Sequence, residues 1–153
     1  MSGKDISPLP SSVLFLCFLN SIRSPMAEGL MKKHYGDKVY VQSCGISKGD
    51  IDDLMVAVMK EVGVDKSGHT ARSLDDIEDK SYDTVIAFTA DAGEAARAVF
   101  EGSDTEIIVW PTPDPTSGEL DVRAMMNNYR SVRNFIENRL LARYGAPATE
   151  ENT

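Results

Sequence analysis

The chain has 153 residues, 42% of them apolar and 26% charged, which is the composition of one ordinary globular domain. This composition disfavours a disordered chain or a small scaffold held by disulfides. Sixteen basic residues against 24 acidic ones give a net charge of −8, so neither nucleic acid nor an anionic membrane is expected as a partner.

Strand and helix patterns alternate along the chain. The continuous apolar run at 13–17 predicts a strand buried on both faces. The Ser24-Pro25 pair predicts the start of a helix with Ser24 as its N-cap, and Gly36 suits the end of that helix. The later predicted elements, in chain order, are a short strand at 39–41, a helix over 54–62, a strand at 84–88, a helix over 92–100, a strand at 106–110 and a long amphipathic helix over 122–140.

Four apolar strands that alternate with helices predict an α/β fold of three layers (αβα), with a four-stranded parallel sheet between helices. We expect residues 13–145 to form a single domain, residues 1–12 to be a flexible arm and residues 146–153 to be a disordered tail. Sheets of this kind bind ligands at the carboxyl ends of their strands. The segments that follow the first and fourth strands, 17–24 and 110–116, are therefore the first candidates for a site.

A cysteine, five loop residues and an arginine connect the first strand to the first helix. The N–H groups of such a loop and the helix dipole can surround a phosphate-sized oxyanion, and the Arg23 guanidinium can hold two of its oxygens. The same groups should stabilise Cys17 as a nucleophilic thiolate, to which Ser24 can donate a hydrogen bond. The residues expected to bind the oxyanion between Cys17 and Arg23 are Phe18, Leu19, Asn20, Ser21 and Ile22, with Asn20 suited to a tight left-handed turn.

This segment resembles the phosphate loop of the low-molecular-weight protein-tyrosine phosphatase family, and the match continues through Pro25, Ala27 and Glu28. The family shares its fold with the thioredoxin-coupled arsenate reductases. The resemblance covers about residues 13–144, includes a segment at 69–72, and implies that Ser43 supports the loop asparagine.

Asp114-Pro115 resembles the second signature of the family, which implies that Asp114 is the general acid of the reaction. The bottom-up argument for the same role is that Asp114 follows the fourth strand, at the sheet edge where Cys17 lies. Taken by itself, Pro-Asp-Pro is equally well read as a turn.

Several positions depart from the phosphatase pattern. Leu19 stands where the family usually has glycine, and Ile22 stands where it often has a second cysteine, so no disulfide can form inside the loop. Thr116 and Ser117 replace the two tyrosines that wall the pocket of eukaryotic-type members. The chain resembles the bacterial reductase-like branch in this respect, as it does at Trp110, and a preference for phosphotyrosine is less expected.

The chain has two cysteines, which suit a reducing compartment, so we expect a cytoplasmic protein. The longest apolar run, 13–19, is far too short to span a bilayer. Thioredoxin-coupled reductases use two further cysteines near and after the third strand, but the segment 87–94 contains none. Cys44 is the one internal candidate for a resolving thiol, and a buried structural role is the preferred interpretation of it. No metal site or cofactor is expected, and His69 is assigned a structural hydrogen bond.

Three hypotheses follow. The leading one is a phosphomonoesterase of the protein-tyrosine type, in which Cys17 forms a phosphocysteine, Arg23 stabilises the charge and Asp114 protonates the leaving oxygen. Its partners would be a phosphorylated protein or a small phosphoester. The alternative is an arsenate reductase that uses an external small thiol, because arsenate has the size and charge of phosphate. The third is a non-catalytic phosphate-binding adaptor. The sequence does not predict the oligomeric state.

Overall fold

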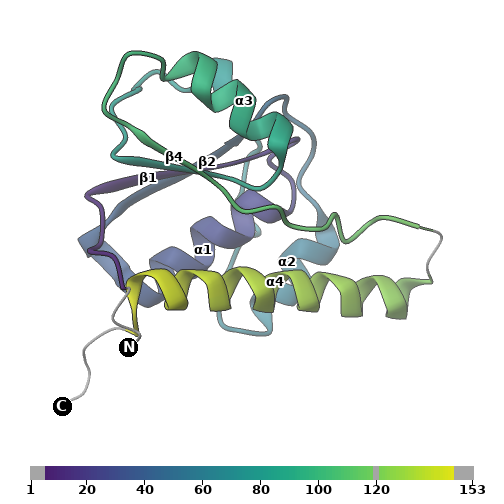
Figure 1. Ribbon diagram of the computed structural model, residues 1–153. Coiled ribbons are helices and arrows are strands. Elements are labelled where there is room, and N and C mark those ends of the chain that lie inside the picture. Colours follow the sequence, from purple (N-terminus) through teal and green to yellow (C-terminus); the bar gives the residue numbers. More distant parts are fainter. Residues whose placement is uncertain (1–5, 119–120, 147–153) are drawn as a thin grey trace.

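The computed structural model describes residues 6–118 and 121–146 and confirms the predicted α/β fold (Figure 1). The strands are β1 (Ser12–Cys17), β2 (Tyr40–Gly45), β3 (Thr84–Ala87) and β4 (Glu106–Val109). The helices are α1 (Arg23–Tyr35), α2 (Asp53–Lys60), α3 (Ala90–Val99) and α4 (Val122–Tyr144), with short 3-10 helices η1 (Gly36–Lys38) and η2 (Leu74–Asp76). Residues 1–5 of the expected arm and 147–153 of the expected tail lie outside the described residues.

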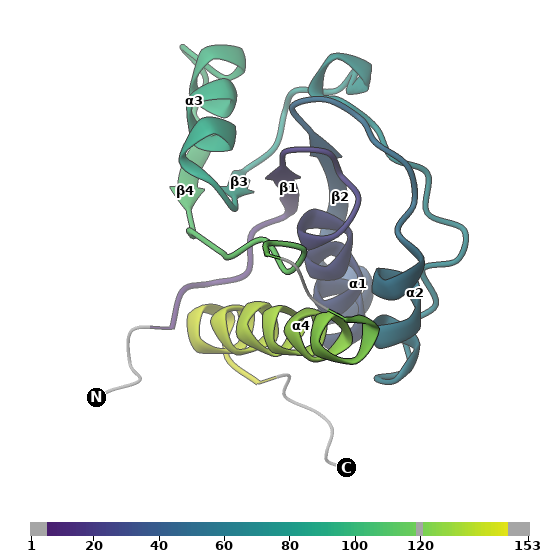
Figure 2. The same cartoon turned by 90° about the vertical axis from the view of Figure 1, so that its right-hand side faces the viewer.

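The four strands are all parallel and lie in the order β2-β1-β3-β4 (Figure 2). Helices α1, α2 and α4 cover one face of the sheet and α3 covers the other (Figure 1). Because side chains alternate along a strand, Val13 and Phe15 pack in the core under the three helices, whereas Leu14 and Leu16 pack in the core under α3. The central strand β1 is therefore buried on both faces, as its apolar run predicted.

Helix α1 begins at Arg23, and the prediction that Ser24 is its N-cap is wrong. Ile22 occupies the N-cap position, with no hydrogen bond from a side chain to the first turn. Ser24 lies inside the helix and is fully buried, because its hydroxyl points back toward the loop that precedes the helix. The end of α1 is as predicted, with Gly36 at the C-cap and a φ of 58°.

Strand β2 is longer than its apolar pattern predicted. It pairs with β1 over its whole length, from Ser12 opposite Tyr40 to Cys17 opposite Gly45. The polar side chains of Gln42 and Ser43 interrupt the apolar pattern. They are nevertheless accommodated, because both form hydrogen bonds to neighbouring segments. As a result, β2 reaches the level of Cys17.

Hydrogen bonds hold α4 against α2 and against the segment that precedes β1. Arg133 is buried, and its Nη1 donates hydrogen bonds to the Val58 carbonyl at 2.7 Å and to Glu61 at 2.9 Å. At the other end, the Ser7 amide donates to the carbonyl of Arg143 at 2.6 Å, so the described part of the arm lies against α4. None of the helices within 6–118 and 121–146 has the length and apolar character needed to cross a bilayer.

The packing of α3 on β4 generates a test of the fold. A Cβ atom on Gly93 would stand 2.6 Å from Val109 Cγ2, so we expect Gly93→Ala to lower the free energy of unfolding by about 1–2 kcal/mol despite the better helix propensity of alanine. Gly68→Ala is the matched control, because no atom lies within 4 Å of its added Cβ. Urea denaturation of both variants measures the difference, and equal stabilities would contradict the packing.

Candidate active site

The loop from Cys17 to Arg23 lies at the carboxyl end of the central strand. The chain leaves β1 toward β2 on one side, whereas β3 and β4 extend the sheet on the other. This arrangement makes the end of β1 the point where the strand order reverses, which is where open parallel sheets bind ligands. The loop then enters the first turn of α1, whose N-terminus adds partial positive charge.

The loop turns its carbonyl groups outward. The carbonyls of residues 17–19 accept hydrogen bonds from amides within the segment 46–49 at 2.9–3.0 Å. The carbonyl of Asn20 accepts one from His69 Nε2 at 2.8 Å, so that nitrogen carries the proton. The amides of residues 18–22 have no acceptor among the described residues. A row of unpaired N–H groups above a cysteine is a binding site for an oxyanion.

Two backbone features allow this shape. Asn20 has a φ of 59°, the left-handed turn expected of it. Gly45 ends β2 directly beside the loop, where an added Cβ would stand 2.7 Å from the carbonyl oxygen of Phe18 and 2.8 Å from the amide nitrogen of Asn20. A side chain at position 45 would therefore push the loop away from the segment that holds its carbonyls.

A buried chain of hydrogen bonds connects Cys17 to Glu28. The Asn20 amide nitrogen donates to Ser24 Oγ at 2.9 Å and to Ser43 Oγ at 3.0 Å. Ser43 in turn donates its proton to Glu28 Oε1 at 2.7 Å, since a carboxylate only accepts. Ser24 Oγ accepts from Asn20 and lies 2.9 Å from Cys17 Sγ and 3.4 Å from the Cys44 carbonyl, which are the two acceptors within reach of its proton. A Ser24 hydroxyl that donates to Cys17 would stabilise a thiolate.

Residues that the sequence did not single out complete this network. The Arg72 amide donates to Asn20 Oδ1 at 2.9 Å, which fixes the orientation of the Asn20 side chain. Lys32 and Lys66 lie 2.9 and 3.4 Å from the Glu28 carboxylate. Burial alone would raise the pKa of Glu28, but Lys66, Ser43 and Lys32 outweigh it and hold the pKa below its ordinary value. Glu28 is thus a carboxylate at neutral pH.

The structure brings the three predicted catalytic residues to one pocket. Cys17, Arg23 and Asp114 all line a cavity of about 340 Å³ at the mouth of the loop. Arg23 Nη1 donates to the carbonyl of Thr112 at 2.9 Å, so this hydrogen bond connects the Cys17–Arg23 loop to the segment that carries Asp114. This contact was not predicted, because it joins residues 89 positions apart.

Asp114 lies at the rim of the pocket and is held by the residue two positions later. Its Oδ1 accepts hydrogen bonds from the Thr116 amide at 2.9 Å and from Thr116 Oγ1 at 2.6 Å. Partial burial favours the neutral acid, but the two Thr116 bonds and the charge of Arg23 outweigh burial and keep the pKa of Asp114 below its ordinary value. The turn expected from Pro-Asp-Pro and the carboxyl group at the pocket are thus both present.

The rim also contains residues that sequence reasoning missed. The exposed side chains of Phe18 and Leu19 were expected there, and Ile51 joins them from the segment before α2. Asp50 and Asp52 come from that same segment. No local sequence pattern identifies Asp50 and Asp52 as pocket residues. Asp52 is the N-cap of α2, where it accepts a hydrogen bond from the Met55 amide at 2.9 Å. The pocket mouth thus combines apolar side chains with carboxylates.

Cys44 lies on the other face of the sheet from Cys17. It is opposite Leu16 in the β1–β2 register, packs in the core under α3 and is fully buried, whereas Cys17 belongs to the core under the three helices. Burial is the main cause that raises the pKa of Cys44 to about 12, so it remains a thiol at neutral pH. A structural role is therefore favoured, because the side chain points away from the face that carries Cys17.

No three His, Cys, Asp or Glu side chains within the described residues are grouped so that they could hold a metal ion. The remaining groups at the pocket are the loop amides, one guanidinium, one thiol and carboxylates. That set can bind a tetrahedral oxyanion, attack it through sulfur and exchange a proton with it.

The chain is similar to several known proteins. The chain is 33% identical over 129 residues to a glutaredoxin arsenate reductase of Synechocystis sp., covering 84% of this chain and 92% of that protein. A solved arsenate reductase in the phosphate-binding state superposes with a TM-score of 0.69 at 28% identity, covering 85% of this chain and 93% of the other. The tyrosine phosphatase amsI of Erwinia amylovora has the same fold, with a TM-score of 0.74 at 19% identity and coverages of 92% and 95%.

The model of a protein family matches residues 12–144, a span that contains all the strands and helices of the described residues and the lining of the Cys17 pocket. The chain therefore belongs to the family of low molecular weight phosphotyrosine protein phosphatase enzymes.

Proposed function

We propose that this chain reduces arsenate, with Cys17 as the nucleophile and an external thiol as the reductant. The observation that carries the proposal is the position of Cys17 beneath five loop amides that have no acceptor among the described residues. Such a nest fits a tetrahedral oxyanion, and relatives about 33% identical to this chain are named arsenate reductases. The sequence led us to expect phosphomonoester hydrolysis first, and these relatives support the alternative better.

The reaction would proceed in three balanced steps. The Cys17 thiolate attacks arsenic, so that an S–As bond forms and one oxygen leaves as water after protonation. An external thiolate then attacks Cys17 Sγ; an S–S bond forms and the S–As bond breaks, leaving its electron pair on arsenic, which departs as arsenite. A second external thiol cleaves the mixed disulfide and restores Cys17. Two thiols are oxidised to one disulfide as As(V) becomes As(III).

The need for an external reductant follows from the cysteine inventory. The chain contains two cysteines, and the second, Cys44, points into the core on the opposite face of the sheet. The loop amides and Ser24 would favour the thiolate of Cys17 in the first step and again when it leaves the mixed disulfide. The Glu28 network acts through Asn20 and Ser24, which makes these three positioning residues.

Arsenate and glutathione test the proposal directly. We expect the wild type to release arsenite, and we expect Cys17→Ser to lower the rate by about 10³-fold or more, because the nucleophile is gone. Cys44→Ser is the matched control. If the wild type forms no arsenite with either glutathione or dithiothreitol, the proposal is wrong.

The position of Cys44 generates a separate prediction. After one turnover without excess thiol, mass spectrometry should find glutathione on Cys17 and no disulfide between Cys17 and Cys44, because the two side chains leave opposite faces of the sheet. The Cys44→Ser variant should keep the arsenite-forming rate within about twofold. A Cys17–Cys44 disulfide in the wild type would contradict this assignment.

Phosphomonoester hydrolysis is the second candidate function, and Asp114 favours it. A carboxyl group in the same pocket as Cys17 and Arg23 is the acid that an alkoxide leaving group needs. Asp114 would protonate the leaving oxygen and then act as the base toward water. A phosphorylated protein or a small phosphoester would be the substrate. A preference for phosphotyrosine is less expected, because Thr116 and Ser117 stand in place of aromatic residues.

Hydrolysis of para-nitrophenyl phosphate tests this second candidate. Asp114→Asn should lower kcat by about 10²–10⁴-fold. Since hydrogen bonds from Thr116 and the charge of Arg23 hold the pKa of Asp114 low, the acid form grows as pH falls, and hydrolysis should increase from pH 7 toward pH 5. Thr116→Val removes one of those bonds, raises the pKa of Asp114 and should shift this profile toward higher pH. A profile that Thr116→Val leaves in place would exclude Asp114 as the acid.

A further inference from the structure

The route from solvent to the Cys17 sulfur passes a set of exposed side chains. Cys17 is 2% exposed, whereas Phe18, Leu19 and Ile51, which line the same cavity, are 50%, 40% and 36% exposed. An inorganic oxyanion is small enough to need only the loop amides and Arg23. A thiol that attacks Cys17 Sγ is longer, so the part of it that does not react remains among the residues of the pocket mouth.

Asp50 is one of these residues, and its neighbours in the chain hold it there. On one side, the Gly49 amide donates a hydrogen bond to the carbonyl of Leu19 at 2.9 Å. On the other side, Asp52 caps α2 by accepting from the Met55 amide at 2.9 Å. The backbone at Asp50 is thus tied both to the Cys17 loop and to α2, which keeps its carboxylate at the mouth.

The Asp50 carboxylate differs from the other charged groups that line the pocket. It is exposed and has no hydrogen-bond or ion-pair partner among the described residues. Asp52 and Asp114 accept hydrogen bonds from protein groups, and Arg23 donates one. Lys48, two residues before Asp50, lies 3.3 Å from a different carboxylate and does not line the pocket. The negative charge of Asp50 therefore acts on whatever enters.

The surroundings of Asp50 strengthen its effect on an entering thiol. Apolar side chains at the mouth displace water, and charges interact more strongly where water is displaced. A carboxylate on the thiol would be repelled by Asp50 and an ammonium group attracted. Building on the arsenate reduction proposed above, we propose that Asp50 selects the external reductant by charge. A thiol that carries an ammonium group then attacks Cys17 faster than a thiol that carries a carboxylate.

The selection can be measured without arsenate. Methyl methanethiosulfonate converts Cys17 of the full chain to a methyl disulfide, in a Cys44→Ser background. Mass spectrometry then follows its reduction by cysteamine, which ends in an ammonium group, or by 3-mercaptopropionate, which ends in a carboxylate. Each rate is divided by the rate at which the same thiol reduces bis(2-hydroxyethyl) disulfide, an uncharged disulfide, so that intrinsic differences in thiol reactivity cancel.

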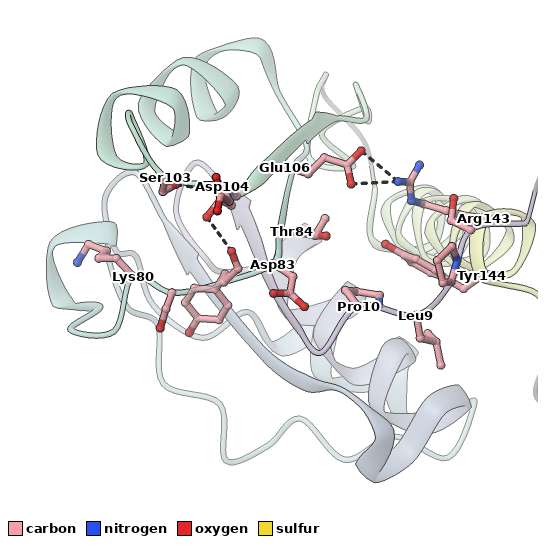
Figure 3. A pocket seen from close by; sticks show the side chains of 15 residues that line it. Leu9, Pro10, Lys80, Asp83, Thr84, Ser103, Asp104, Glu106, Arg143 and Tyr144 are labelled. Carbon is pink, nitrogen blue, oxygen red and sulfur yellow. Dashed lines mark hydrogen bonds and ion pairs between the residues drawn. The ribbon is translucent and has the colours of Figure 1, made fainter.

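We expect the normalised rate with cysteamine to exceed that with 3-mercaptopropionate by about fivefold or more at low salt. About 0.5 M NaCl should bring the ratio toward one, because salt screens charges at the surface. Asp50→Asn should lower the ratio about two- to threefold at low salt. Asp104→Asn is the matched control, because Asp104 is also exposed but lines a separate cavity of about 840 Å³ near Tyr144, at the other end of the sheet (Figure 3).

Two results would overturn the proposal. One is a normalised ratio of one or less in the wild-type pocket, and the other is a ratio that Asp50→Asn leaves unchanged or that Asp104→Asn changes as much. Either result would leave arsenate reduction standing, since the methyl disulfide is reduced without arsenate. Conversely, a failure to form arsenite with any thiol would overturn the proposed function and not the measured ratio. With arsenate present, the same preference for cysteamine should appear in the rate of arsenite formation.

Discussion

The loop around Cys17 works as an anion site because every carbonyl at its start points away from the centre, and Asn20 is the residue that holds this arrangement. Its left-handed backbone turns the loop, its carbonyl oxygen is held by His69, and its side-chain oxygen is held by the amide of Arg72. Its side-chain nitrogen then orders two serines, one toward Cys17 and one toward Glu28. Four contacts of one residue thus hold the shape of the loop and keep Ser24 beside Cys17.

The parallel sheet supplies the surroundings that this loop needs. Because β2 pairs with β1 up to Gly45, the chain after β2 runs directly beside the loop and its amides can hold the carbonyls of residues 17–19. The segment after β4 arrives at the same edge, and Arg23 joins it to the loop through Thr112. Cys17 and Arg23 belong to one loop, whereas Asp114 comes from a distant part of the chain, and the strand order brings them to one pocket.

The same sheet separates the two cysteines. The alternation of side chains along β1 and β2 sends Cys17 to the face covered by three helices and Cys44 to the face covered by α3. Under the proposed function, reduction at Cys17 would need a thiol that enters from solvent through the pocket mouth. The mouth of the pocket is formed by the carboxylates of Asp50, Asp52 and Asp114 and by the apolar side chains of Phe18 and Leu19.

The sequence by itself determined the fold class, the family and the loop, because a buried strand, a Cys-x5-Arg segment and a helix start are local patterns that carry their own physical meaning. It also marked Asn20, Ser24, Ser43 and Asp114. The direction of the Ser24 side chain was decided by tertiary structure. A serine before a proline can cap the helix or form a hydrogen bond to a neighbouring sulfur, and the local sequence does not distinguish these two roles.

The roles of Arg72 and Lys66, and the opposite directions of the two cysteines, were also decided by tertiary structure. Each depends on strand register or on a contact between segments far apart in the chain. The cavity near Tyr144 belongs to the same class, because four separate segments form it and no local pattern marks any of them. A local pattern limits the roles that a residue can take, and the packing of distant segments determines which of these roles it has.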